Sequence, residues 1–180
     1  METNSRTVFN NSLIYGLITA AISIVFAVFA YILDIPQQSP IMYFSFVILL
    51  AGMIYGTVQY RNKYSGGYIS FGKAFISGFL IVIIAAVISS IYSYIFLTFI
   101  DPSYLDKIVE QAMEKAEKSM MDKGLTDEQM EPGLAMTRKF LSPGIMSFFV
   151  VIYSALIGAI FALISAAIIK KEDKSLKGQF

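Results

Sequence analysis

Long stretches without a charged residue dominate this chain. Four of them contain no Asp, Glu, Lys, Arg or His, and they cover residues 7–33, 35–60, 74–100 and 140–169. A helix crosses the roughly 30 Å hydrocarbon core of a bilayer with about 20 apolar residues. A soluble helix would instead carry charges every turn or so on its face toward water. The pattern predicts four transmembrane helices near residues 12–33, 41–60, 75–99 and 144–169.

The first run has an alternative interpretation as a cleaved signal peptide. Residues 28–30, Val-Phe-Ala, resemble a small-residue cleavage site. However, the charge-free run is far longer than the usual apolar region of about 7–15 residues, and Glu2 offsets the positive charge of Arg6. The first run is therefore interpreted as a membrane span.

Local signals mark where the spans begin and end. Ser39-Pro40 and Ser142-Pro143 each place a capping serine before a proline at the first helical position, where the missing N–H costs nothing. Asp101-Pro102 interrupts the third span and can cap the helix that follows. These signals predict a short turn between the first two spans.

Orientation follows from the lysines and arginines between the spans. Residues 61–73 carry Arg61, Lys63 and Lys73 and no acid, and four lysines follow residue 169. The loop at residues 61–73 and the tail at residues 170–180 are therefore both predicted to be cytoplasmic. Both termini are then on the cytoplasmic side. The segment 101–141, whose nine acids exceed its six bases, is then extracytoplasmic.

The segment 101–141 is also amphipathic. Its apolar residues recur at helical spacing, and they are Leu105, Ile108, Val109, Ala112, Ala116 and Met120. Gly124 suits a helix C-terminus, and Thr126 with Gln129 matches a capping box that starts a second helix, which Glu131-Pro132-Gly133 is expected to break. The segment is either a partner-binding hairpin or a solvated connection, and it either protrudes or lies on the membrane surface.

Small residues recur at spacings typical of helix–helix contacts. In lipid, close backbone approach and van der Waals contact drive helix association. The candidate helix-packing residues are Gly16, Ala20, Gly52, Gly56, Gly78, Ser154, Gly158 and Ala162. Intramolecular bundling is the favoured interpretation, and a homodimer contact through one stripe is the alternative.

The composition excludes several kinds of chemistry. Histidine, cysteine and tryptophan are absent and the net charge is +1, which excludes a catalytic triad with His, a Cys-based zinc site and the basic stripe of a nucleic-acid binder. Asp34 with Asp101, or Ser70 with Lys73, could do acid–base chemistry, but a turn and helix caps explain these residues more simply. No enzyme, cofactor or metal site is predicted.

The loop between the second and third spans is the most distinctive stretch. Gly66 and Gly67 favour a turn, and aromatic residues beside a lysine suit the membrane–water boundary. The loop either seats the third span or contacts a lipid or a partner. Its candidate contact residues are Gly66, Gly67, Tyr68, Phe71, Lys73 and Phe75.

The run of residues 67–79, GYISFGKAFISGF, resembles the signature of a bacterial membrane-protein family, domain of unknown function 4199, frequent in Bacteroidota. The plan of two spans, this loop, a third span, a polar segment and a last span is similar over about residues 7–174. The resemblance implies a bacterial setting and no established activity, cofactor or catalytic residue.

The sequence as a whole predicts an all-α fold. Residues 1–180 are expected to form one domain, a bundle of four antiparallel transmembrane helices in a bacterial inner membrane. The predicted function is non-enzymatic assembly in the lipid bilayer, with a second copy or another membrane protein as partner. The alternative is a small transporter or channel lined by mid-span Ser, Thr and Tyr residues such as Tyr15, Tyr55, Tyr92 and Tyr153.

Overall fold

The computed structural model describes residues 5–36 and 39–171. The lysines predicted in the tail at positions 174 and 177 lie outside these residues. The chain divides into two compact units, which we describe separately. Unit 1 comprises Met1–Ser89 and Val151–Phe180, and unit 2 comprises Ser90–Val150.

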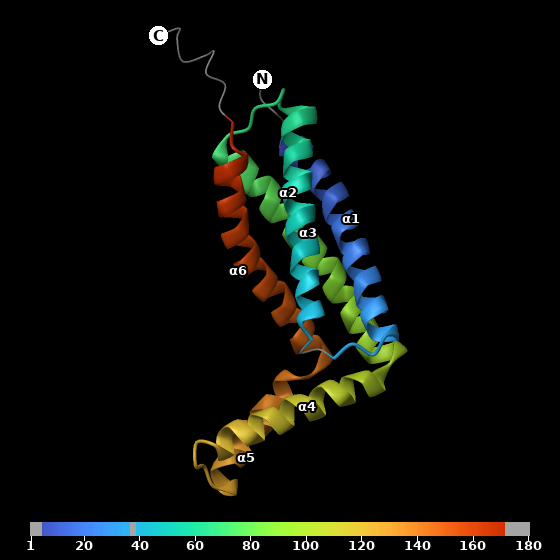
Figure 1. Cartoon of the computed structure of the whole chain (residues 1–180), viewed down its shortest axis with the longest axis vertical. Helices are drawn as coiled ribbons and strands as arrows, with labels where there is room; N and C mark the ends of the chain where they lie inside the picture. The colour runs from blue at the N-terminus through green and yellow to red at the C-terminus, as the bar shows by residue number, and fades with distance from the viewer. Residues whose placement is uncertain (1–4, 37–38, 172–180) are drawn as a thin grey trace. The chain divides into compact units, whose positions relative to one another are not determined.

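The prediction of an all-helical protein with four membrane-capable helices is confirmed. The helices long and apolar enough to cross a membrane are Ser5–Ile32, Pro40–Tyr64, Phe71–Ile100 and Pro143–Ile169. Figure 1 shows the corresponding α1 (Ser5–Ile32), α2 (Phe44–Tyr64), α3 (Phe71–Ile95) and α6 (Pro143–Ile169) lying side by side. Large apolar side chains cover their outer surfaces, as lipid contact requires, and Ile168 is 78% exposed.

Several helices begin or end at residues other than the predicted span boundaries. Helix α1 begins at Ser5 rather than near residue 12, because Val8 and Asn11 in its first turns are already buried against the other helices. The second span opens with a 3-10 turn, η1 (Pro40–Tyr43), and α2 continues to Tyr64. Arg61 and Lys63 in the last turn of α2 stabilise its C-terminus through the helix dipole.

The third span begins four residues before its predicted start at residue 75, at Phe71, and ends in a π-helical turn. Ala74 N–H donates to Ser70 O at 3.0 Å as the first turn of α3 forms. At the other end, η2 (Phe96–Ile100) is π-helical, and Asp101 N–H donates to Phe96 O at 2.9 Å. Pro102 has no N–H to extend this ladder, so the chain starts a new helix there.

The interior of unit 1 is filled by side chains. Met53, Val82 and Ala162 form one buried apolar cluster. A second cluster lies where the ends of several segments meet, and it contains Val8, Tyr60, Ile69, Ala74, Ala166 and Ile169. Both clusters join residues far apart in sequence, so the bundle is held by contacts among α1, α2, α3 and α6.

Unit 2 contains the amphipathic helices α4 (Pro102–Met121) and α5 (Asp127–Phe140). Asp101 caps α4 by accepting a hydrogen bond from Tyr104 N–H at 3.1 Å. Gly124 has φ +75° at the end of α4, and the capping box of Thr126 and Gln129 starts α5. These local signals act as the sequence predicts.

The predicted break at Pro132 is wrong, because α5 runs through it. Proline removes one backbone hydrogen bond and crowds the preceding turn. Packing against α4 offsets this cost: Met130 is buried, and Met120 from α4 lies over Gly133. Tertiary contact therefore outweighs the local breaker.

Candidate functional site

The predicted helix-packing glycines of α2 lie at close helix crossings within unit 1. A Cβ on Gly52 would collide with the Thr19 side chain of α1. A Cβ on Gly56 would lie 2.6 Å from Ile81 Cδ1 of α3 and 2.7 Å from Tyr15 Cβ of α1. Both glycines let neighbouring helices approach to a distance that a larger residue would forbid.

The other three predicted glycines also lie at contacts between these helices. A Cβ on Gly16 would be 2.7 Å from Ile84 Cγ2, and one on Gly158 would be 2.5 Å from Val82 Cγ1. Gly78 is less tight, with Met53 Cγ at 3.2 Å. These crossings lie inside the chain, which favours intramolecular bundling over a homodimer as the use of the glycines.

The remaining packing candidates are placed less uniformly. Ala20 and Ala162 are both 0% exposed, and Ala162 belongs to the cluster around Met53 and Val82. Ser154 is half-buried. Two of the three therefore lie in the interior of the bundle.

Sequence reasoning missed a pair of buried polar residues on α1. Asn11 Nδ2 donates to Gly56 O of α2 at 3.0 Å, and Ser12 Oγ donates to Ser77 O of α3 at 3.2 Å. Both side chains are buried and tie α1 to two neighbours. The signal was present in the sequence, because an asparagine within a charge-free run needs a partner in lipid.

The distinctive loop connects α2 to α3. Gly66 and Gly67 have φ +60° and +85°, a conformation that favours glycine. Tyr68 and Phe71 are exposed, Lys73 and Phe75 are half-buried, and the Phe75 ring stacks on Phe79 with centroids 5.7 Å apart.

This loop also meets the end of α6, which the sequence does not reveal. Ile69 and Lys171 exchange two backbone hydrogen bonds of 2.9 and 3.0 Å. Arg61 Nη1 donates to Ile169 O at 3.2 Å, and Lys171 Nζ lies 5.5 Å from the centre of the Tyr68 ring. The end of α2, the start of α3 and the end of α6 are thus joined at one place.

Comparison with known proteins gives a family. Residues 14–171 match a family model described as "Protein of unknown function (DUF4199)". This chain belongs to the DUF4199 family. The matched range contains the run 67–79, so the resemblance drawn from that run is confirmed. No curated protein and no solved structure matches the chain.

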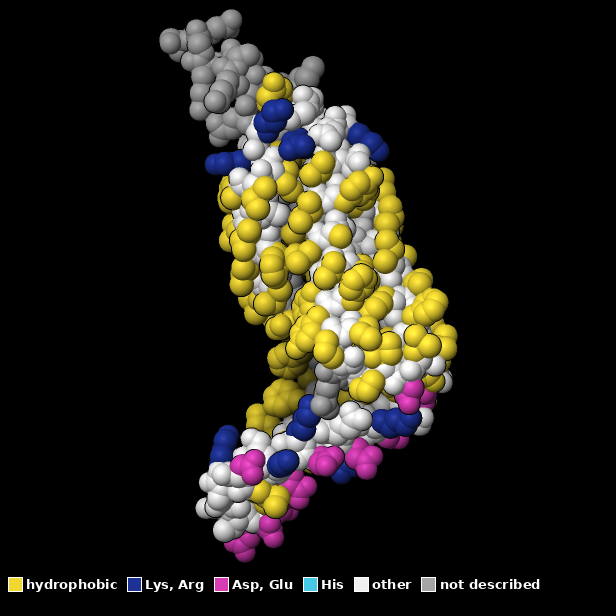
Figure 2. All heavy atoms as spheres, viewed as in Figure 1, with side chains coloured by type: hydrophobic (Ala, Val, Ile, Leu, Met, Phe, Trp, Pro, Cys, Tyr) yellow, Lys and Arg dark blue, Asp and Glu magenta, His cyan; other side chains and the backbone are white. Residues whose placement is uncertain are grey.

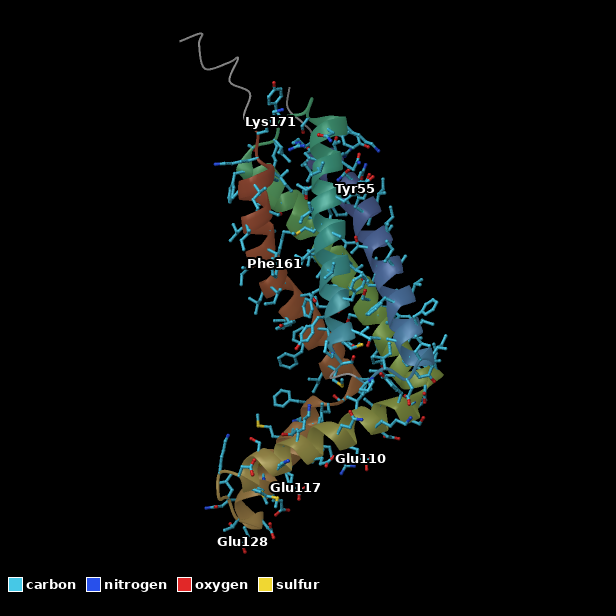
Figure 3. The ribbon with its side chains drawn as sticks, viewed as in Figure 1. Tyr55, Glu110, Glu117, Glu128, Phe161 and Lys171 are labelled. Atoms are coloured by element: carbon cyan, nitrogen blue, oxygen red, sulfur yellow. The ribbon has the colours of Figure 1, made fainter. Side chains whose placement is uncertain are left out.

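The DUF4199 chain has a second candidate site in unit 2, an open hollow between α4 and α5. Its volume is about 630 Å³. Figure 3 labels Glu117 on α4 and Glu128 on α5, two of its lining residues. The full lining is Met113, Glu117, Asp127, Glu128, Met130, Glu131, Leu134, Ala135 and Arg138. Four acids and one arginine thus surround an apolar floor.

The candidate chemical groups of this DUF4199 chain have structural roles. Asp34 lies in the turn after α1 with φ 48°, and Asp101 caps α4. Among residues 5–36 and 39–171, no group of three or more His, Cys, Asp or Glu could hold a metal ion. Ser70 accepts the N–H of Ala74 through its backbone carbonyl at the start of α3.

Proposed function

We propose that this DUF4199 chain is a non-enzymatic multi-pass protein of a bacterial inner membrane that binds another membrane protein through unit 2. Its four spans form an antiparallel bundle, both termini are cytoplasmic, and residues 101–141 lie outside the cytoplasm. The partner presents a basic segment with apolar residues.

The hollow between α4 and α5 carries this proposal. Its floor is made of side chains such as Met113, Met130 and Leu134, while Glu117, Glu128 and Glu131 are exposed around it. Methionine adapts to apolar partners of irregular shape, and carboxylates attract lysine and arginine. A second copy fits less well, because its basic loop and tail would be on the opposite side of the membrane.

The bundle supports this proposal over transport. Thr19 and Thr57 each donate to a carbonyl of their own helix, at 2.7 and 2.8 Å, instead of lining a path. Tyr55 and Tyr153 are 58% and 55% exposed, so their rings lie on the outer surface that faces lipid. The interior at Met53 and Val82 is filled by apolar side chains.

Topology can be tested directly because the chain contains no cysteine. We would introduce Lys123→Cys in unit 2 and Lys63→Cys in unit 1 and treat intact cells with a membrane-impermeant maleimide. In intact cells we expect labelling of Lys123→Cys and not of Lys63→Cys. We expect Lys63→Cys to be labelled only after the membrane is opened. Labelling of Lys63→Cys in intact cells would contradict the orientation.

Partner binding can be tested by photocrosslinking in the membrane. A photoreactive residue at Ala135 lines the hollow, and the same residue at Gln111 lies on the exposed surface of α4 outside it. We expect a defined adduct with another membrane protein from Ala135 alone, and its loss when Glu131→Lys is added. Equal adducts at both positions, or adducts unaffected by Glu131→Lys, would overturn the proposal, and an adduct of doubled mass would indicate a second copy.

A further inference from the structure

Basic side chains from three segments gather at one end of unit 1. Arg61 and Lys63 lie in the last turn of α2, Lys73 in the first turn of α3, and Lys170 and Lys171 directly after α6. We call these five residues the basic cluster. Figure 2 shows lysine and arginine side chains at the end of the helices, beyond the apolar surface.

Specific contacts hold the basic cluster together. Arg61 Nη1 bonds to Ile169 O, a residue 108 positions away in the chain, at 3.2 Å. The backbone pairing of Ile69 with Lys171 fixes the end of α6 against the loop. Ile69 and Ile169 are 3% and 6% exposed, so the platform below the charges is packed. The fold therefore holds the Arg61 side chain at the end of α6 and the backbone of Lys171 against the loop.

The segments that supply the basic cluster carry no acid. Residues 60–73 and 169–171 contain no Asp or Glu, whereas Glu172 and Asp173 follow directly after Lys171 in the sequence, so the five bases exceed these two acids by three. The exposed members are Lys63, Lys170 and Lys171, and Arg61 is half-buried. An anion would therefore meet several positive groups without a competing carboxylate from these segments.

An exposed apolar surface adjoins these charges. Tyr64, Tyr68 and Phe71 are 46%, 40% and 41% exposed, and they come from the same helix ends and loop as the bases. Ile168, two residues before Lys170, is 78% exposed on α6. A ligand that matches both surfaces has an anionic head and a hydrocarbon tail. Clustered bases directly beside membrane spans are the usual contacts of anionic lipid headgroups.

We propose that the basic cluster binds an anionic phospholipid. The headgroup phosphate lies among Lys63, Lys170 and Lys171, beside Arg61. The acyl chains lie along Tyr68, Phe71 and Ile168. This inference is independent of the partner proposed for unit 2.

The full-length protein would be placed in nanodiscs of phosphatidylcholine with or without phosphatidylglycerol, and lipid retention after transfer to detergent would be measured by native mass spectrometry. We expect selective retention of phosphatidylglycerol by the natural sequence. The triple variant Lys63→Gln, Lys170→Gln, Lys171→Gln should lose retention, by roughly fivefold for each lysine removed.

A matched control removes the same charge elsewhere. Lys107, Lys115 and Lys118 are exposed lysines of α4, and their triple replacement by Gln should leave retention within about twofold. Circular dichroism would verify that both variants stay helical. Glycerol phosphate added as a competitor should displace little lipid, because it lacks the acyl chains.

Three outcomes would overturn the proposal. The first is equal retention of both lipids by the natural sequence. The second is an equal loss in both triple variants, which would show a general effect of net charge. Full displacement by glycerol phosphate would also overturn it, because the site would then bind a free phosphate and not a lipid.

Discussion

Units 1 and 2 each bring a helix against a glycine, but the side chains that meet the two glycines differ. In unit 1, Gly52 faces Thr19, a stiff β-branched side chain whose hydroxyl bonds to Tyr15 O at 2.7 Å. In unit 2, Gly133 faces Met120, whose Cε lies 2.7 Å from the position of an added Cβ. Only the second contact is with the end of a flexible chain.

The difference follows from what each unit buries. In lipid the hydrophobic effect gives helices no reason to associate, so the spans of unit 1 rely on close approach and on interhelical hydrogen bonds. The α4–α5 pair has apolar and charged faces, so it can associate by burying apolar side chains such as Met130. Rigid fit should therefore matter more in unit 1 than in unit 2.

The largest expected effect tests this difference with one substitution in each unit. Gly52→Ala should destabilise the bundle by about 2 kcal/mol, because the methyl group has no room beside Thr19. Gly133→Ala should be neutral or stabilise α5 by up to about 1 kcal/mol, because Met120 can move and alanine favours the helix. Unfolding in mixed detergent micelles, followed by circular dichroism, measures the first, and amide exchange in α5 measures the second.

Gly72→Ala is the control for the alanine itself, since nothing lies within 4 Å of a Cβ there. It should leave the unfolding midpoint unchanged or raise it slightly. If Gly52→Ala behaved like Gly72→Ala, the close crossing of α1 and α2 would not contribute to stability.

The next effect concerns the buried polar contact of α1. Asn11→Ala removes the bond from Nδ2 to Gly56 O, which is 3.0 Å long, and should cost about 1 kcal/mol of bundle stability. Asn10, its neighbour, is exposed, so Asn10→Ala should change the unfolding midpoint little. Equal midpoints for the two variants would mean that this bond does not hold α1 to α2.

The contact of Asn11 with Gly56 also shows what the sequence could and could not predict. The spans were predictable because a missing charge is a property of each segment alone, and the capping box of Thr126 and Gln129 lies within four residues. The partner of Asn11 was not predictable, since Gly56 is 45 positions away. The sequence shows that a buried amide needs a partner but does not say which helix supplies it.

The candidate sites divide in the same way. Tyr68 and Phe71 were predictable as residues of the membrane–water boundary, because aromatic residues next to a span are typical of that boundary. The pairing of Ile69 with Lys171 was not, because it depends on how α6 packs. The break at Pro132 was predicted wrongly for a related reason: the contact of Met120 with the Gly133 region comes from another helix.

The smallest expected effect returns to unit 2 and that proline. Pro132 lies inside α5, whereas Pro102 opens α4 at the position where the missing N–H costs nothing. Pro132→Ala should restore a helical hydrogen bond and slow amide exchange across the middle of α5, a net gain of about 0.5 kcal/mol. Pro102→Ala should leave exchange in α4 unchanged or faster, because proline is suited to the first turn.

Amide exchange is measured in both full-length proline variants, so each substitution reports on the helix that contains it. Slower exchange confined to α5 would show that packing against α4 offsets a local cost at Pro132. Unchanged exchange in Pro132→Ala would contradict that account, because it would mean that the proline costs α5 nothing. The helix α5 would then continue past Pro132 without help from its packing against α4. The flexible contacts of unit 2 would in that case matter less to its stability than the comparison with unit 1 suggests.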